Sequence, residues 1–189
     1  RSGAVSIVSG EGFAQELIAG PIRQFRQHYP NVSIALDIHG TNEIMRRVRE
    51  DEAEIGLVYY PPADSHITAR GAARQPMHAI VHSQHPLASA AQTSLQELSQ
   101  WPIAMLQGVY GIRQLVEYAE RKDKIHLSPA LTSNLISVLL AFVTSGQGVT
   151  LLPPCSVTAE LASGRLRAIP IHNPAFQDAE MQLITRTGR

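Results

Sequence analysis

The sequence predicts an α/β protein made of two lobes. Two series of alternating strands and helices support this prediction, one in the first 75 residues and one in the middle of the chain. In the first series, strand, helix, strand, helix and strand follow one another with short connections, as in a parallel sheet. Because parallel sheets bind ligands at the carboxyl ends of their strands, we expect a cleft where the strand ends of the two lobes meet.

Composition narrows the class of protein. A chain of 189 residues with 44% hydrophobic and 17% charged residues is typical of a globular protein with one large or two small cores. Lys+Arg and Asp+Glu both number 16, so no net field attracts DNA, and we do not expect this chain alone to bind DNA tightly. The longest mainly apolar segment, residues 135–143, is far shorter than the roughly 20 residues of a membrane helix.

Two further features bear on localisation. The single cysteine, Cys155, excludes an internal disulfide and suits a reducing compartment, so the predicted localisation is cytoplasmic. The chain opens with Arg1 rather than Met and shows no secretory signal, which favours a fragment of a longer protein. A mature secreted protein trimmed of its signal would also lack both features.

The first series of elements begins with an apolar strand over residues 4–9. Apolar residues then recur at helical spacing from Phe13 to Tyr29, with a proline in the middle. We expect either one kinked helix or two short helices with Pro21 in the first turn of the second. Residues 32–38 alternate strictly between apolar and polar side chains, which predicts a strand.

The first series closes with a helix and a strand. Thr41 or Asn42, directly after Gly40, is expected to cap a helix whose apolar positions recur every three to four residues. A strand over residues 54–59 follows and ends at two prolines.

The second series begins with a strand over residues 77–81. A capping-box spacing from Ser94 to Glu97 opens a short helix, and residues 102–106 form the next strand. Residues 111–121 are expected to be helical.

The end of the second series contains the clearest amphipathic helix of the sequence. Ser133 or Asn134 is expected to cap it, and apolar side chains follow at helical spacing from Leu135. Gly146 would end this helix in a left-handed conformation, and residues 149–152 would form a buried strand. Further strand-like segments are residues 165–171 and 181–185.

Six segments, in their order and spacing, resemble the effector-binding domain of LysR-type transcriptional regulators. Each segment alone is a helix end, a turn or a strand that other α/β proteins also use. They are GPIRQFRQHYPNVSIAL (20–36), EIGLV (54–58), SQHPLAS (83–89), SLQELSQWPI (94–103), FVTSGQGVTLLPP (142–154) and SGRLRAIPI (163–171). Glu54 stands where the family more often has Asp, a small departure.

The resemblance implies two Rossmann-like lobes of the type II periplasmic-binding-protein kind, joined by two crossing strands. On this interpretation lobe I comprises residues 1–75 and 172–189, and lobe II comprises residues 76–171. It also implies homodimers or tetramers, with DNA bound only through an amino-terminal winged helix-turn-helix that this sequence lacks. The helix over residues 13–29 is the candidate interface, although its expected outer face shows no obvious apolar excess.

Four loops at the carboxyl ends of predicted strands contain the candidate ligand-binding residues. Each loop precedes or opens a helix, so free backbone N–H groups and the positive end of the helix dipole would favour an anion such as a carboxylate. The family places its effector in this region. The candidates are Ser9, Gly10, Glu11, Thr41, Asn42, Gln107, Val109, Tyr110, Gly111, Ser133 and Asn134.

Several candidates have a second interpretation. The hydroxyl and amide residues after residues 40 and 132 could serve only as helix caps. Glu11 would repel an acidic ligand unless it is paired, and Arg113 is a candidate partner. Tyr110 could close over an aromatic or apolar ligand, or it could pack between the lobes.

Other motifs favour structural roles. His78 and His82 share one face of a strand while His85 belongs to a turn, so we predict no metal site and no cofactor. Cys155 is expected to be a small buried hydrophobe rather than a redox sensor.

Arg46, Arg47 and Arg49 form a basic stripe, but four acidic residues within 50–54 follow it, which favours a solvated helix face. Motifs for nucleophilic catalysis, phosphate binding or zinc hydrolysis are absent from the sequence.

These observations predict the effector-sensing and oligomerisation domain of a bacterial transcriptional regulator, which is not an enzyme. A small, anionic effector would bind between the lobes and change their relative angle. A secreted solute-binding protein of the same fold is the first alternative. An enzyme that uses the same cleft is the second, and it would require matched groups with perturbed pKa values there.

Overall fold

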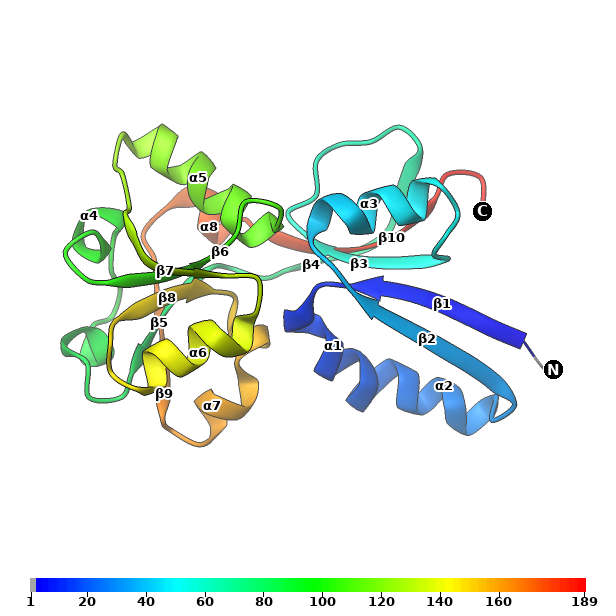
Figure 1. Ribbon diagram of the computed structural model, residues 1–189, viewed down its shortest axis with the longest axis horizontal. Coiled ribbons are helices and arrows are strands. Elements are labelled where there is room, and N and C mark those ends of the chain that lie inside the picture. The colour runs from blue at the N-terminus through cyan, green and yellow to red at the C-terminus, as the bar shows by residue number, and fades with distance from the viewer. Residues whose placement is uncertain (1–2) are drawn as a thin grey trace. The chain divides into compact units, whose positions relative to one another are not determined.

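The computed structural model describes residues 3–189, which fold into two compact units (Figure 1). Unit 1 contains the residues up to Ala73 and those from Met181 to Arg189, and unit 2 contains Arg74–Glu180. Each unit is an α/β structure around a five-stranded sheet. The α/β class predicted from the sequence is therefore confirmed.

Unit 1 has the sheet order β2-β1-β3-β10-β4. Strands β1 and β2 are parallel, as are β1 and β3, but β10 runs antiparallel to β3, so the sheet is mixed. Helix α3 lies over one face of the sheet and α1–α2 over the other (Figure 1). The elements are β1 (Gly3–Ser9), α1 (Glu11–Leu17), a π-helix η1 (Ile18–Ile22), α2 (Arg23–His28), β2 (Val32–Ile38), α3 (Thr41–Arg49), β3 (Ile55–Tyr59), β4 (Ile67–Arg74) and β10 (Glu180–Arg186).

The helix predicted around Pro21 is one continuous helix. Leu17, Ile18, Ile22 and Arg23, which flank the π-helical turn, all have right-handed helical backbone angles. A π-helical turn is a common way for a helix to accept an irregularity such as proline, which has no N–H to donate. The expectation of a single helix is confirmed.

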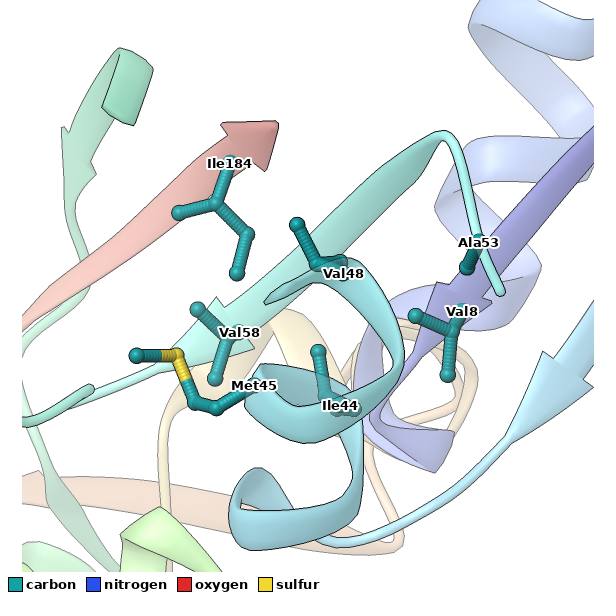
Figure 2. Close-up of a cluster of buried hydrophobic side chains, with 7 residues drawn as sticks. All are labelled: Val8, Ile44, Met45, Val48, Ala53, Val58 and Ile184. Atoms are coloured by element: carbon teal, nitrogen blue, oxygen red, sulfur yellow. The ribbon is translucent and has the colours of Figure 1, made fainter. Parts of the chain in front are cut away.

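The core of unit 1 lies between α3 and the sheet (Figure 2). The apolar positions of α3 face strands β1, β3 and β10, as the helical spacing predicts. Burying each aliphatic side chain of this kind contributes about 1.5–3 kcal/mol. The buried cluster comprises Val8, Ile44, Met45, Val48, Ala53, Val58 and Ile184.

Unit 2 repeats this plan with the sheet order β7-β6-β8-β5-β9. Strand β6 is parallel to β7 and β8, and β5 is antiparallel to β8 and β9. The strands are β5 (His78–His82), β6 (Ile103–Leu106), β7 (Pro129–Ser133), β8 (Val149–Leu152) and β9 (Leu166–Pro170). The α-helices are α4 (Leu95–Leu98), α5 (Gly111–Asp123), α6 (Ile136–Thr144), α7 (Thr158–Ala162) and α8 (Pro174–Gln177), and the 3-10 turns are η2 (Pro86–Ser89) and η3 (Pro154–Ser156).

The two glycines of the segment Gly146-Gln147-Gly148 have different structural roles. Gly146 has a φ of 75°, so it ends α6 in the left-handed conformation that the sequence predicts. Gly148 has an ordinary backbone, but a Cβ atom there would lie 2.1 Å from the carbonyl oxygen of Pro102. The first glycine is required by conformation and the second by close packing next to β8.

The second boundary between the units lies later in the chain than residue 172. Helix α8 belongs to unit 2, because Phe176 is fully buried there and its carbonyl accepts from the Met77 amide at 2.9 Å. Asn173, which caps α8, also donates to Asp123 of α5 at 2.9 Å. The segment between the last two predicted strands thus contains a capped helix that packs on unit 2.

Several elements were not predicted. Strand β4 and helices α7 and α8 fall in segments without clear periodicity, and β7 was expected only as the loop before α6. Both sheets are mixed because one strand in each runs antiparallel to its neighbour. This strand is β10 in unit 1 and β5 in unit 2. None of the helices in residues 3–189 is long and apolar enough to cross a membrane.

Candidate functional site

The candidate residues of unit 1 lie together at the carboxyl edge of its sheet. Because β1, β2 and β3 are parallel, all three chains leave the sheet at this edge. The His39 amide donates to the Ser9 carbonyl at 3.0 Å and joins the ends of β1 and β2. Ser9 is fully buried, and its hydroxyl donates to the Gly10 carbonyl at 2.9 Å. Gly10 caps α1, and Glu11 is the first residue of that helix.

Helix α3 begins at this edge without a side-chain cap. The expectation that Thr41 or Asn42 caps it is wrong, because Gly40 is the cap residue and Thr41 and Asn42 are the first two helical residues. The buried Thr41 hydroxyl instead makes a long contact, 3.5 Å, to the Tyr59 carbonyl at the end of β3. The first turn of α3 therefore offers backbone N–H groups with no side-chain cap from Gly40.

Tyr60 is not among the candidates from the sequence, but it lies at the same edge of the sheet. It directly follows β3 at the same edge and has a φ of 50°, which is rare for a residue other than glycine. Strained positions of this kind cluster at functional sites. The sequence signal was the pair of tyrosines before two prolines at the end of a strand.

The candidate residues of unit 2 lie at the corresponding edge of the second sheet. Strands β6 and β7 are parallel, and the Gln107 amide donates to the Ser133 carbonyl at 3.2 Å. Tyr110 is the cap residue of α5, and Gly111 is its first residue. Val109, in the preceding loop, is 49% exposed.

Helix α6 begins one or two residues later than predicted. The expectation that Ser133 or Asn134 caps it is wrong, because Leu135 is the cap residue. The Ser133 hydroxyl accepts a hydrogen bond from the Leu135 amide at 3.1 Å and so shapes the turn before the helix. The Asn134 carbonyl accepts from the Tyr110 hydroxyl at 2.9 Å. Tyr110 therefore joins the two loops of unit 2.

Arg113, a charged residue near the unit 2 loops, forms ion pairs with residues of its own helix. Arg113 pairs with Glu117 at 3.1 Å and with the buried Glu120 at 3.5 Å, both on α5. Glu120 also accepts from the Leu127 amide at 2.7 Å. These contacts give Arg113 a structural role in α5. Backbone N–H groups and neutral side chains are thus the donors that these loops offer.

The basic stripe on α3 is neutralised by acidic residues. Arg46 pairs with Glu43 at 2.8 Å and with Glu52 at 2.7 Å, and Arg47 shares Glu43 at 2.8 Å. Hydrogen bonds from Arg46 and Arg47 lower the pKa of Glu43 to about 2. Arg49 pairs with Asp64 at 3.1 Å. This arrangement agrees with a solvated helix face rather than a phosphate site.

The histidines and the cysteine show no joint site. The Nδ1 atoms of His82 and His85 accept from backbone amides at 3.1 Å, and His85 caps η2. His78 contacts the Pro76 carbonyl at 3.0 Å. Within residues 3–189, no group of three or more His, Cys, Asp and Glu side chains is arranged to hold a metal ion. Cys155 lies in η3 and is half-buried rather than buried as expected.

Curated relatives of the chain are transcriptional regulators. The activator CmpR of Synechocystis is 27% identical over 174 residues, which cover 91% of this chain and 55% of CmpR. The regulator CbbR of Rhizobium meliloti is 29% identical over 168 residues, or 88% of this chain and 51% of CbbR. The chain thus spans about half the length of these relatives. Both are named HTH-type regulators, which favours the regulator prediction over the solute-binding alternative.

Solved structures share the fold. The effector binding domain of QuiR in complex with shikimate matches with a TM-score of 0.84 at 14% identity, over all of this chain and 90% of that chain. The regulatory domain of Synechocystis CcmR in complex with 2-PG also matches with a TM-score of 0.84, at 18% identity, over all of this chain and 89% of that chain. These similarities confirm the predicted fold class.

Family membership follows from the whole length of the chain. The family model described as "LysR substrate binding domain" matches residues 1–189. The prediction that the chain is a regulator domain and not an enzyme agrees with this family. The chain belongs to the LysR substrate binding domain family.

Proposed function

We propose that this domain senses a small oxyanionic effector at the helix starts that follow the parallel strands of its two units. One observation carries the proposal: in both units, helices begin directly after parallel strands at the carboxyl edge of the sheet. Helices α3, α5 and α6 all start there, and none has a side-chain cap. The first turn of a helix presents N–H groups that have no acceptor within the helix, together with the positive end of the helix dipole, which suits a carboxylate or a phosphate.

The neutral character of these loops favours recognition by backbone dipoles. Arg113 is held by two glutamates, so the proposed site binds an anion through N–H groups and hydroxyls such as that of Thr41. The structures that match in fold were solved with shikimate and with 2-PG, both small acids, which supports the same ligand class. Glu11, at the start of α1, would disfavour a ligand that carries several negative charges close to it.

The effector would act by favouring one arrangement of the two units. A ligand shifts such an equilibrium only if it binds one arrangement better than the other. We infer that this shift is transmitted in the cytoplasm to an amino-terminal DNA-binding domain of the kind that the relatives named HTH-type carry. DNA contact by this domain itself is not part of the proposal, since the arginines of α3 are paired with acids.

A thermal-shift screen tests the ligand proposal. The panel contains shikimate, 2-phosphoglycolate, other small carboxylates, amino acids and inorganic phosphate. A ligand present at one hundred times its dissociation constant stabilises the native state by about 2.7 kcal/mol and raises the melting temperature. We expect a hit among the small acids that is weakened in Thr41→Val. If uncharged compounds bind and the acids, amino acids included, do not, the oxyanion proposal is wrong.

We also propose that the domain forms a homodimer through helix α1–α2 and strand β2. Unlike the expectation from sequence, this helix exposes apolar side chains: Ile18 is 56% exposed, Phe25 36% and Tyr29 44%. An open groove of about 540 Å³ runs between the helix and β2, which is an edge strand, and Ile22 and Ile34 line it. A second copy is the proposed occupant.

The complementary surface is on unit 2. There β7 is also an edge strand, and α6 next to it leaves Leu135 47% and Val138 37% exposed. Pairing unit 1 of one copy with unit 2 of the other would cover both apolar surfaces twice in one dimer. We expect sedimentation equilibrium to show a dimer that Ile18→Glu dissociates. Tyr118→Glu, at a residue on α5 that is 38% exposed, should remain dimeric; a monomeric wild type would refute this proposal.

A further inference from the structure

The two units connect their equivalent strands and helices differently. In unit 1, β1 and α1 are separated by Gly10 alone. In unit 2, the equivalent β6 and α5 are separated by residues 107–110. A longer connection has more conformations to lose, so it needs its own contacts to stay in one conformation.

The short connection in unit 1 is held by backbone hydrogen bonds. The Gly10 amide donates to the Leu57 carbonyl at 3.3 Å, and the His39 amide donates to the Ser9 carbonyl at 3.0 Å. These two bonds tie the ends of β1, β2 and β3 to one another. Backbone hydrogen bonds thus hold the start of α1 in place, together with the bond from the Ser9 hydroxyl to the Gly10 carbonyl.

The long connection in unit 2 uses side chains in addition. The Gln114 amide group donates to the Gly108 carbonyl at 2.9 Å, and the Tyr110 amide donates to the Gln107 carbonyl at 3.2 Å. Both bonds stay within the loop and α5. The Tyr110 hydroxyl reaches farther, to the Asn134 carbonyl in the loop between β7 and α6, at 2.9 Å.

Burial contributes little to holding these loops. Val109 is 49% exposed and Leu135 is 47% exposed, and Asn134 is also exposed. Where few apolar contacts fix a segment, one hydrogen bond changes its opening equilibrium roughly two- to tenfold. The hydroxyl of Tyr110 is therefore placed to decide how rigidly the two loops are held.

We propose that Tyr110 is a positioning residue that clamps the starts of α5 and α6 to each other. As the cap residue of α5, it fixes the first turn of that helix, and through Asn134 it fixes the residue before the cap of α6. Its effect on ligand binding rests on the proposed function; its effect on the loops does not.

Hydrogen exchange of the Tyr110→Phe variant tests the clamp without a ligand. We expect exchange in residues 107–110 and 133–136 to accelerate roughly two- to tenfold, while the buried half of α5 is unchanged. Tyr118→Phe removes a hydroxyl from the same helix and should leave both loops as in the wild type. Unchanged exchange in the loops of Tyr110→Phe would overturn the proposal.

Binding of 2-phosphoglycolate and of inorganic phosphate tests the consequence. For whichever of these the wild type binds, Tyr110→Phe should weaken affinity by about the same factor as it opens the loops, and Tyr118→Phe should not. Faster exchange with unchanged affinity would show a clamp that does not serve the site. If the wild type binds neither probe, phosphate-bearing ligands are excluded from the proposed class, and the exchange experiment still decides whether Tyr110 is a clamp.

Discussion

Units 1 and 2 share one sheet order but bury their equivalent helices to different extents. Strands β2-β1-β3-β10-β4 correspond in position to β7-β6-β8-β5-β9, so the helix from Glu11 to His28 corresponds to α5. In α5, six residues are buried, whereas Phe13 is the one buried residue in the described helix of unit 1. The same topology thus gives one helix packed within its unit and one whose apolar residues remain exposed.

The difference indicates what the helix of unit 1 is for. Apolar residues at helical spacing normally face a core. Here Ile18, Phe25 and Tyr29 keep that spacing but are exposed, and the ring centroids of Phe25 and Tyr29 lie 4.9 Å apart with the rings tilted at 36°. An unpartnered apolar surface of this kind favours a protein partner. The comparison therefore supports the proposed dimer without reference to the family.

The largest expected effect concerns where unit 2 ends. Phe176→Ala should destabilise unit 2 by about 3–5 kcal/mol, because the ring is fully buried and leaves a cavity. Urea unfolding followed by the fluorescence of Trp101, the single tryptophan and a unit 2 residue, measures this directly. A loss below about 1 kcal/mol, well under the usual range, would indicate that α8 is not part of the core of unit 2.

A second prediction compares glycines beside equivalent strands. Gly148→Ala places a methyl 2.1 Å from a backbone carbonyl, whereas Gly56→Ala places one 2.7 Å from the side chain of Ile184, which can rotate. We expect both substitutions to lower the free energy of unfolding, Gly56→Ala by about 1–3 kcal/mol and Gly148→Ala by more. The backbone carbonyl next to residue 148 cannot move as easily as the side chain next to residue 56. Circular dichroism during urea unfolding compares the two; the reverse order would contradict the packing described for β8.

A third prediction compares the ends of α3 and α6. Both are followed by a left-handed residue, Asp51 with a φ of 62° in unit 1 and Gly146 with a φ of 75° in unit 2. Gly146→Ala should cost about 1 kcal/mol through backbone conformation alone, because a Cβ there meets open space. Gly146→Asn should cost less, since Asn tolerates this conformation. If Gly146→Ala and Gly146→Asn lower the free energy of unfolding equally, as measured by Trp101 fluorescence, backbone conformation is not the cause.

The smallest expected effects are pH-dependent and differ between the units. In unit 2, burial lowers the pKa of His85 below 6.5, so the folded state favours the neutral ring. The associated stability is fully present above pH 6.5 and is lost as the pH falls through the folded pKa. Protonation would also remove the Nδ1 acceptor that bonds the Leu87 amide. His85→Asn keeps a capping oxygen and should abolish this pH dependence of Trp101-detected stability.

In unit 1, the pH-dependent loss of stability occurs at lower pH. Glu43, with a pKa lowered from 4.5 to about 2, stabilises the fold above pH 4.5 and loses this contribution as the pH falls towards 2. NMR titration of the Glu43 carboxyl should show a pKa near 2 that rises in Arg46→Gln. Arg121→Gln, on α5 of unit 2, should leave the pKa of Glu43 unchanged.

The sequence predicted those parts of the fold in which one local pattern dominates. Alternation identified β2, the heptad-like spacing identified α6, and Gly146 identified its end. Strand β4 was missed because its residues are mostly exposed, so no apolar periodicity marks it. Helix α8 was missed because four residues are too few for a periodic signal, and only its Asn173 cap and Phe176 anchor it.

The candidate site was predicted less completely than the fold. Parallel strands with short connections placed the candidate loops of each unit at one edge of its sheet. The exact cap residues were not predictable, because Gly40 and Leu135 cap α3 and α6 through backbone geometry rather than through a preferred side chain. Likewise, the bond from Tyr110 to Asn134 joins residues 24 positions apart and depends on the packed loops.

The proposed function places an oxyanion at the helix starts that follow the parallel strands of each unit. Its most direct test is an NMR titration of amide resonances with 2-phosphoglycolate, or with the best acid from the thermal-shift panel. The account predicts that amides of Thr41 and Asn42 in unit 1 shift together with those of Gly111 and Ile136 in unit 2. Saturable shifts confined to one unit, or to residues away from these helix starts, would contradict it.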